Sequence, residues 1–454
     1  MQTQGRQARK FTPARSKRKR THLTVRPGII LLYARLMQTP LRQPAVMWAA
    51  GLLIALSVLA LWLARPQPPE PVRVGVIHSL SGVMAESERG LVDGLSLAVD
   101  QINAAGGVLG RPIETVVADT RSDDERAASE AARLIDTEGV QALFGCWTSS
   151  CRQAVRPIVE AKQTLLFYPV QYEGLEQSPN IIYGGSAPNQ QILPGTAWAI
   201  ETFGPRLFLV GSDYVFPRTA NRLIRDLANA NGGLVLDEHY LPLTADDFSS
   251  VAARIRQRNP DVILNTVNGD SNRALFAALR DAGLHHIPVV SFSVAEPMTR
   301  MLARDAFHPS HYAVWGYFED LDIPGNAEFV AAFRAHAGTD QPVSDPVLTS
   351  YLAMRLWAAA AGRAGSTDPQ RVRRNLGRTS IAGPHGPVAV DSATGHLWRQ
   401  AYVGQASADG GFKIVHRFEQ PLRPAPFPVH RSRAHWIRVS GAPVAPEPAG
   451  ASTP

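Results

Sequence analysis

The sequence predicts an α/β protein with two lobes, each built on a mostly parallel sheet flanked by helices. From Val72 onward, short apolar segments of strand composition alternate with longer segments whose apolar residues have helical spacing. Strands that alternate with helices in this way form parallel sheets with helices on both faces. The alternation runs in two series of roughly 100 residues or more, which is the usual length of a domain.

The first series begins with a buried strand at 72–80 and a helix that ends near Asn103. The glycine-rich run 106–112 follows a helix and precedes a strand, whereas a phosphate-binding loop needs the opposite order, so we interpret it as a turn. The remaining expected elements are a strand at 113–119, a helix at 123–138 and two strand–loop units within 142–191.

The second series begins at 206, and a long Ala- and Leu-rich helix at 346–364 is expected to follow a crossing between the lobes. Expected strands lie at 206–214, 233–240, 261–270 and 287–296, with helices to about 231, at 249–258 and at 271–282, before β-rich segments at 386–391, 396–405 and 412–420. The predicted first lobe comprises 72–192 and about 323–375, and the second comprises 193–322 and about 376–430.

The positive charge of the chain is concentrated at its N-terminus. Residues 1–44 contain eleven Lys or Arg and no acidic residue, while the whole chain carries a formal net charge of +7. The remainder therefore has a net charge of −4 and is mildly acidic. A nucleic-acid partner is not expected for such a body.

Residues 45–64 are twenty consecutive uncharged positions. A helix of that length, at about 1.5 Å per residue, matches a hydrocarbon core of roughly 30 Å. The basic flank predicts a cytoplasmic tail at 1–44 and an exported body after the Pro-rich linker at 65–71. We favour an uncleaved anchor over a cleaved signal peptide, whose apolar core is usually shorter. Residues 431–454 are expected to form a tail.

The most informative stretch is 143–191, which predicts a pocket for a small, planar, uncharged ligand. An apolar strand runs into Gly145, and Trp147, Thr148 and Ser149 stand at the start of an amphipathic helix. A Ser or Thr there caps the helix, and the free N–H groups of its first turn form a site for acceptor atoms.

A second apolar strand ends in Tyr168 and a polar loop that carries Gln171. Open α/β sheets bind ligands at the carboxyl ends of their strands. In the second series Tyr214, Asp270 and Glu296 also follow strands, and each is either a ligand contact or a residue of a turn or cap.

The sequence shows no catalytic, metal-binding or cofactor-binding constellation. The Ser149–Ser150 pair lacks a G-x-S-x-G frame, and no His stands at a matching strand end. The two cysteines of the chain, Cys146 and Cys151, have no nearby His that would make a zinc site. We expect them to be free thiols beside the pocket, because a helix start between them would hold them apart; a local disulfide is the alternative.

Several segments carry a family resemblance, and they keep their order along the chain. They are GCWTSS (145–150), LLFYPVQYEGLEQSPNIIYGGSAPNQQ (165–191), LVGSDYVFPRTANR (209–222), YLPLTADDFSSV (240–251), ILNTVNGDSN (263–272), HYAVWGYF (311–318) and GPVAVD (386–391). From Val72 to about Phe427 the sequence resembles the periplasmic substrate-binding proteins of urea-type ABC transporters, and it is similar to amide-sensing regulators. The resemblance implies a type I periplasmic-binding fold that closes on its ligand and presents it to an ABC permease.

The resemblance also implies which residues surround the ligand. They are Trp147, Ser149, Tyr168 and Tyr214, with Thr148 and Gln171 as neighbours. The amide sensors have a smaller aromatic residue at Trp147 and Thr-Pro at Val170-Gln171, and at both places this chain agrees with the urea binders. We therefore expect a tethered periplasmic protein that binds urea or a short-chain amide.

The chemistry of urea fits these residues. Ser149 and Tyr168 would donate to its carbonyl, groups near Asp270 or Glu296 would accept from its N–H groups, and Trp147 would stack on its plane. Two alternatives remain open at this point: a membrane-anchored urea or amide sensor, and a branched-chain amino-acid binder. The latter needs charged partners for carboxylate and ammonium, which 145–150 does not supply.

Overall fold

The computed structural model describes residues 44–63 and 69–440 of the 454-residue chain. The chain divides into two compact units, 1–68 and 69–454, which are described separately. In the first unit, Pro44–Leu63 form helix α2. Among the described residues we find no helix that combines the length and apolarity needed to cross a membrane. Of the predicted tail at 1–44, only Pro44 lies within the described residues.

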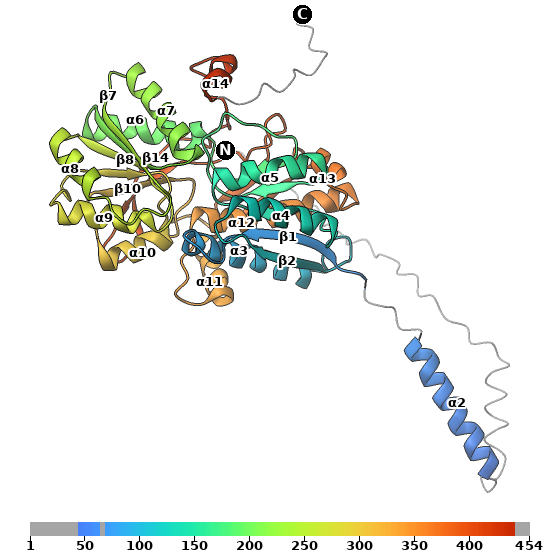
Figure 1. The fold of residues 1–454 in the computed structure, drawn as a ribbon. Coiled ribbons are helices and arrows are strands. Elements are labelled where there is room, and N and C mark those ends of the chain that lie inside the picture. The colour runs from blue at the N-terminus through green and yellow to red at the C-terminus, as the bar shows by residue number, and fades with distance from the viewer. Residues whose placement is uncertain (1–43, 64–68, 441–454) are drawn as a thin grey trace, which may run out of the picture. The chain divides into compact units, whose positions relative to one another are not determined.

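The second unit contains two large sheets, seen on opposite sides of the body in Figure 1. The first sheet has five parallel strands in the order β2-β1-β3-β4-β5. Its strands are β1 (Val72–His78), β2 (Ile113–Asp119), β3 (Leu143–Gly145), β4 (Leu166–Tyr168) and β5 (Ile181–Tyr183). The inner strands β1, β3 and β4 are almost wholly buried, as expected for a parallel sheet covered on both faces.

Helices between these strands cover the first sheet: α3 (Ala85–Ala104), α4 (Asp124–Asp136) and α5 (Ser149–Ala161). They are joined by α12 (Asp345–Ala364) and α13 (Pro369–Leu376) from much later in the chain. Helix α12 packs closely on α3: the Ser350 hydroxyl donates to Leu91 O over 2.8 Å. A Cβ on Gly94 would lie 2.7 Å from Val347 O, so this contact requires glycine.

The second sheet has seven strands in the order β14-β13-β10-β9-β8-β6-β7. Five of them are parallel, and β13 and β14 add antiparallel pairs at one edge. The strands are β6 (Arg206–Ser212), β7 (Leu234–Leu241), β8 (Val262–Thr266), β9 (Val289–Ser291), β10 (His311–Trp315), β13 (Tyr402–Ala406) and β14 (Phe412–Arg417). The accompanying helices are α6 (Ile192–Phe203), α7 (Val215–Ala230), α8 (Ser249–Arg258), α9 (Ser271–Asp281) and α10 (Glu296–Asp305).

The remaining elements connect or flank the lobes. They are the short helix η1 (Pro188–Gln190), α11 (Asn326–Ala337), the hairpin β11 (Ser380–Gly383) with β12 (Gly386–Ala389), and α14 (Arg433–Ser440). The predicted two-lobed α/β fold is confirmed. The residue boundaries of the lobes stay predictions, and two expected strands are shorter than predicted: 261–270 contributes only β8, and 287–296 only β9.

A buried guanidinium joins three segments that connect the lobes. Arg399 Nη1 donates to Gly184 O over 2.6 Å and to Thr349 Oγ1 over 2.9 Å, and Nη2 pairs with Asp345. Gly184 follows β5, Asp345 begins α12, and Arg399 precedes β13. Because Arg399 and Asp345 are buried, their pairing fixes the connecting segments relative to one another.

Candidate functional site

The candidate site begins where β3 ends. Gly145 has a φ of 148°, and a Cβ there would lie 1.9 Å from Ile77 O, so only glycine fits. Cys146 N donates to Ile77 O over 2.9 Å, which ties the end of β3 to β1. The chain then enters α5, with Thr148 as its N-cap: Thr148 Oγ1 accepts from Cys151 N over 3.1 Å.

Cys146 and Cys151 form a disulfide, so the expectation of free thiols is wrong. Their Cα atoms are 5.7 Å apart, within the range that a disulfide spans. Cys146 has a φ of 64°, which turns the chain back toward the first turn of α5. The helix start therefore brings the two sulfurs together. The bond closes a small ring that contains Trp147, Thr148 and Ser149.

Trp147 connects the two lobes. Its side chain is 4% exposed, and its Nε1 donates to Oδ1 of Asn268 over 3.2 Å. Asn268 lies after β8 in the second sheet, in the NTVNGDSN stretch. Asn268 is itself fixed, because its backbone N–H donates to Ser212 Oγ over 3.0 Å.

Gln171 makes a second connection between the lobes. Its Nε2 donates to Phe292 O over 2.9 Å, and Phe292 follows β9. The amide oxygen Oε1 is buried and has no hydrogen-bond partner among the described residues. Gln171 therefore presents an unpaired acceptor at a point where the two lobes meet.

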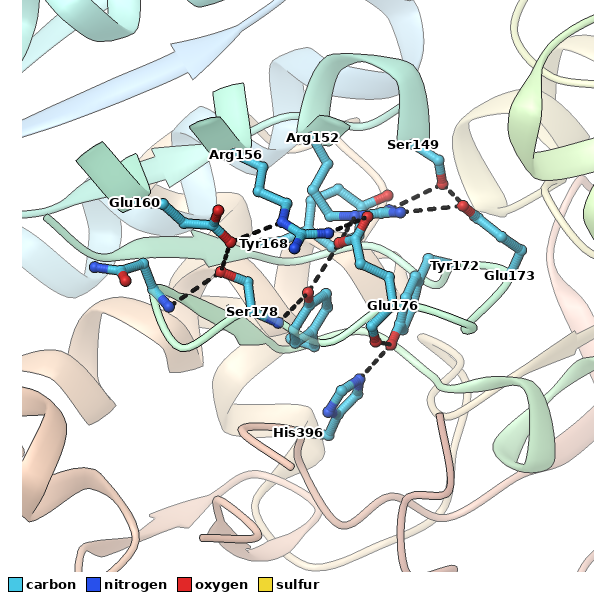
Figure 2. A network of polar contacts seen from close by, with 12 residues as sticks. Ser149, Arg152, Arg156, Glu160, Tyr168, Tyr172, Glu173, Glu176, Ser178 and His396 are labelled. Carbon is cyan, nitrogen blue, oxygen red and sulfur yellow. Dashed lines mark hydrogen bonds and ion pairs between the residues drawn. The ribbon is translucent and has the colours of Figure 1, made fainter. Parts of the chain in front are cut away.

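Ser149 belongs to a buried charged network that sequence analysis missed. Figure 2 shows Arg152 extending from α5 toward Ser149 and Glu173. Ser149 Oγ donates to Glu173 Oε2 over 2.5 Å and accepts from Arg152 Nη1 over 2.9 Å. Arg152 also pairs with Glu173 Oε1 over 3.1 Å and with Glu176 Oε1 over 2.9 Å. All four side chains are buried.

The two carboxyls of this network differ in their proton affinity. Burial raises the pKa of Glu173, and the nearby Arg152 offsets this only in part. The pKa of Glu176 is lowered, because its Coulomb attraction to Arg152 and its hydrogen bonds to Arg152 and Tyr183 outweigh its burial. The pKa of Arg152 is raised well above its usual range, since its two carboxylate partners outweigh its burial. The guanidinium charge is thus neutralised within the protein.

Aromatic rings pack against Arg152. Its guanidinium carbon lies 4.9 Å from the ring centroid of Tyr168 and 4.6 Å from that of Tyr172. The Tyr168 hydroxyl donates to Trp147 O over 2.6 Å. It therefore holds the Trp147 backbone in place. In this arrangement Tyr168 and Ser149 each donate their hydroxyl proton to an acceptor of the protein. To donate to a ligand carbonyl they would have to give up that acceptor, and their donation to a ligand stays a prediction.

Behind Tyr172 lies a stacked histidine, drawn in Figure 2. His396 stacks on Tyr183 with a centroid separation of 4.2 Å. Its Nδ1 lies 2.8 Å from Thr394 O, which can only accept, so Nδ1 carries the proton in the neutral ring. Nε2 then accepts from the Tyr172 hydroxyl over 2.5 Å.

Tyr214 lies at the start of α7, in the second lobe. Its pKa is raised well above the usual range, mainly by burial and next by Coulomb interactions with Tyr168 and Glu173 of the first lobe. Tyr214 is therefore near enough to Tyr168 and Glu173 to interact with them electrostatically. Its role as a ligand contact remains a prediction.

Asp270 and Glu296 have different surroundings. Asp270 is exposed at the N-cap of α9 and makes no capping bond. Glu296 is buried: its Oε1 accepts from Glu319 N over 3.0 Å, and Oε2 has no partner among the described residues. Burial raises its pKa well above the usual range. The roles of Asp270 and Glu296 as ligand contacts stay predictions.

A small cavity adjoins the N-terminus of α5. Its volume is about 50 Å³, and Thr148, Ser150 and Cys151 line it. The other lining residues come from the loops after β1 and β2, from the first turns of α3 and α4, and, for one residue, from the second lobe: Ser79, Met84, Glu88, Thr120, Ser122, Asp123, Asp124 and Leu243. Within the described parts of the chain, no group of three or more His, Cys, Asp or Glu could hold a metal ion.

Comparison with known proteins identifies the family. The model of the periplasmic binding protein domain matches residues 72–433. A Leu/Ile/Val-binding protein homolog of Brucella suis is 25% identical over 353 residues, covering 73% of this chain and 85% of the relative.

Two solved structures share the fold. An R. palustris solute-binding protein in complex with 4-hydroxybenzoate has a TM-score of 0.70 at 22% identity, covering 78% of this chain and 98% of that one. A Streptococcus pneumoniae branched-chain amino-acid transporter substrate-binding protein in complex with isoleucine has a TM-score of 0.67 at 20% identity, covering 77% and 99%. Both of these proteins are named as solute- or substrate-binding proteins of transporters. The chain belongs to the periplasmic binding protein domain family and is a periplasmic substrate-binding protein for a small ligand.

Proposed function

We propose that this protein captures urea, or a short-chain amide, between its lobes and presents it to an ABC permease. The observation that carries the proposal is the amide of Gln171, whose Oε1 is buried without a hydrogen-bond partner among the described residues. Leaving such an acceptor unpaired costs about 1–3 kcal/mol. A ligand rich in N–H groups would satisfy it, and urea has four N–H bonds on a planar frame.

The charges near the site favour a neutral ligand. Arg152 is the cation in the buried network, and Glu173 and Glu176 already occupy it. An anionic ligand would meet two carboxyls and one engaged guanidinium, so it would be desolvated without a free counter-charge. Urea and short amides carry no charge and avoid this cost.

The closed arrangement favours a ligand of few atoms. Trp147 and Gln171 bond directly to the opposite lobe, which leaves little room between them and it. The nearby cavity of about 50 Å³ is a few times the roughly 10–15 Å³ that one water needs. A molecule with four heavy atoms, such as urea, matches this scale better than an amino acid or an aromatic acid.

Branched-chain amino acids are the second candidate, because the relative in Brucella suis is named a Leu/Ile/Val-binding protein homolog. That ligand needs donors for its carboxylate and an acid for its ammonium. Glu173 is a buried acid near the site, but both of its oxygens are engaged, by Ser149 and Arg152. The sensor alternative, which the expected anchor and the basic N-terminal tail motivated, stays a prediction.

A thermal-shift panel tests the ligand class. The full chain is heated with urea, acetamide, leucine or 4-hydroxybenzoate, each over a concentration series. Binding to the folded state raises Tm as ligand concentration exceeds Kd. Because urea also denatures, low millimolar concentrations are used, with Gln171→Leu as the matched control that lacks the side-chain amide. A urea or acetamide shift that is absent in the variant supports the proposal; a shift with leucine or 4-hydroxybenzoate alone would overturn it.

A further inference from the structure

A second hollow lies away from the candidate site. It has a volume of about 1400 Å³ and lies between α13, the segment before β5, the loop after β12, and α14. We call it the arginine groove. Its lining residues are Gln177, Ser178, Pro179, Ile182, Arg373, Arg374, Leu376, Gly377, Arg378, Val390, Asp391, Ser392, Ala393, Thr394, Gly395, Arg433, Ala434 and Ile437.

The charge of the arginine groove is strongly positive. Four of its lining residues are arginines, and Asp391 is the one acid among them. Asp391 is already engaged, because its Oδ2 accepts from Arg423 Nε over 3.1 Å and its Oδ1 accepts from Thr394 N over 3.0 Å. The groove therefore keeps an excess of guanidinium charge.

Three of these arginines lack an acidic partner. Within residues 44–63 and 69–440, Arg373, Arg374 and Arg378 form no side-chain hydrogen bond or ion pair. Arg373 is half-buried, and burial lowers its pKa. A guanidinium that is partly removed from water without an anion is unfavourable. A bound anion would remove this cost.

The shape and lining of the groove point to a polypeptide. Ile182, Leu376 and Val390 supply apolar contact area, and Ser178 and Thr394 supply hydroxyls. Its volume exceeds the roughly 300–1,000 Å³ of a typical small-molecule site. A planar guanidinium binds a carboxylate with two parallel hydrogen bonds. A hollow of this kind admits an extended chain, which a flat bilayer surface cannot enter.

We propose that the arginine groove docks an acidic, extended segment of a partner polypeptide. The carboxylates of that segment pair with Arg373, Arg374 and Arg378 on one wall and with Arg433 on the other. The groove includes the residues before β5, whereas the candidate ligand site lies at the carboxyl ends of β3 and β4. Docking therefore leaves the ligand cleft free.

Fluorescence anisotropy with a labelled hexaglutamate peptide tests this proposal on the full chain. We expect saturable binding that disappears as NaCl rises from about 0.1 M to about 1 M, because the screening length falls from about 10 Å to about 3 Å. The Arg374→Gln/Arg378→Gln variant, altered at two exposed groove residues, should bind at least about tenfold more weakly. A labelled hexaserine peptide should not bind.

The matched control is Arg363→Gln/Arg371→Gln, which removes the same charge from exposed residues outside the groove lining. It should change the affinity less than about twofold. Equal loss in both variants, absence of hexaglutamate binding, or binding of phosphatidylglycerol vesicles through these arginines in its place would overturn the proposal. Urea binding should be unchanged in both variants, so the outcome is independent of the proposed ligand.

Discussion

Trp147 Nε1 donates a hydrogen bond of 3.2 Å to Asn268 Oδ1. The two residues lie 121 positions apart in the sequence, and their bond joins the two lobes. Gln171 makes a parallel link to Phe292 O. Both links start from the loops that hold the candidate site. Residues that surround the ligand therefore also stabilise the closed arrangement, and weakening a link should weaken ligand binding.

Replacing Asn268 by Ala tests this coupling. The change removes the acceptor of Trp147 in the opposite lobe, while the hydrogen bond from its backbone N–H to Ser212 Oγ is retained. One hydrogen bond contributes about 0.5–1.5 kcal/mol, so we expect urea affinity to fall about two- to tenfold. Small-angle scattering should show a more open unliganded protein. An unchanged affinity with an unchanged radius of gyration would show that this link does not hold the lobes.

Tyr168→Phe tests the support of Trp147. The variant keeps the ring against Arg152 and removes the donor to Trp147 O. Urea affinity should fall by about five- to tenfold in calorimetry, because Trp147 is less well held. The control is Tyr312→Phe in the second sheet, where the hydroxyl forms no hydrogen bond with the described residues; it should bind urea as the wild type does. If Tyr168→Phe bound urea with wild-type affinity, the Tyr168 hydroxyl would make no contribution to ligand binding.

The disulfide should couple ligand binding to redox state. Cys146 and Cys151 are the two cysteines of the chain, so a reductant acts on this bond alone. Reduction frees the ring that contains Trp147, Thr148 and Ser149. We expect urea affinity to fall about tenfold in reduced protein, and Cys146→Ser/Cys151→Ser should not respond to the reductant.

Thermodynamic linkage supplies a second readout of this coupling. If urea binds the oxidised form about tenfold more tightly, saturating urea must lower the reduction potential of the bond by about 30 mV. The potential is measured by equilibration with dithiothreitol redox buffers. Identical affinities and identical potentials in the two states would contradict the coupling.

His396 should make stability depend on pH. Burial lowers its pKa from 6.5 to about 4, so the folded state favours the neutral ring. The unfolded state then binds more protons below pH 6.5, and stability that is complete above that pH is lost toward pH 4. By pH 5 this amounts to about 2 kcal/mol. Guanidinium chloride unfolding at pH 7.5 and pH 5 measures it.

His396→Phe is the matched variant, since it keeps a ring to stack on Tyr183 and removes the titrating group. The loss of stability between the two pH values should shrink by about 2 kcal/mol. Buried His308 and His311, whose pKa values are lowered to about 4 and about 3, keep part of the pH dependence in both proteins. An equal loss in variant and wild type would exclude His396 as a source.

The sequence predicted the architecture well because burial and periodicity are local signals. The strand at 113–119 and the helix at 249–258 have the expected bounds. β8 and β9 are shorter than expected, because the polar loops that follow them also contain apolar residues such as Val267 and Val294. Apolar composition cannot separate a strand end from a buried loop.

The site was predicted in part. Trp147, Ser149, Tyr168 and Gln171 do lie together, since strand order brings their loops to one edge of the sheet. Arg152 was missed because a charge on an amphipathic helix usually lies in solvent. Arg152 comes three residues after Ser149, so the two side chains lie on the same face of the helix. This spacing was the feature of the sequence that could have indicated its place in the site. The disulfide depended on the positive φ of Cys146, which the sequence does not reveal.

Calorimetric titration with urea and with acetone tests the central claim most directly. Both molecules have a carbonyl and four heavy atoms, and only urea carries N–H groups. If the buried acceptor Gln171 Oε1 selects the ligand, urea should bind at least about tenfold more tightly than acetone, since one unpaired acceptor costs about 1–3 kcal/mol. Equal binding of the two, or binding of neither, would contradict the account.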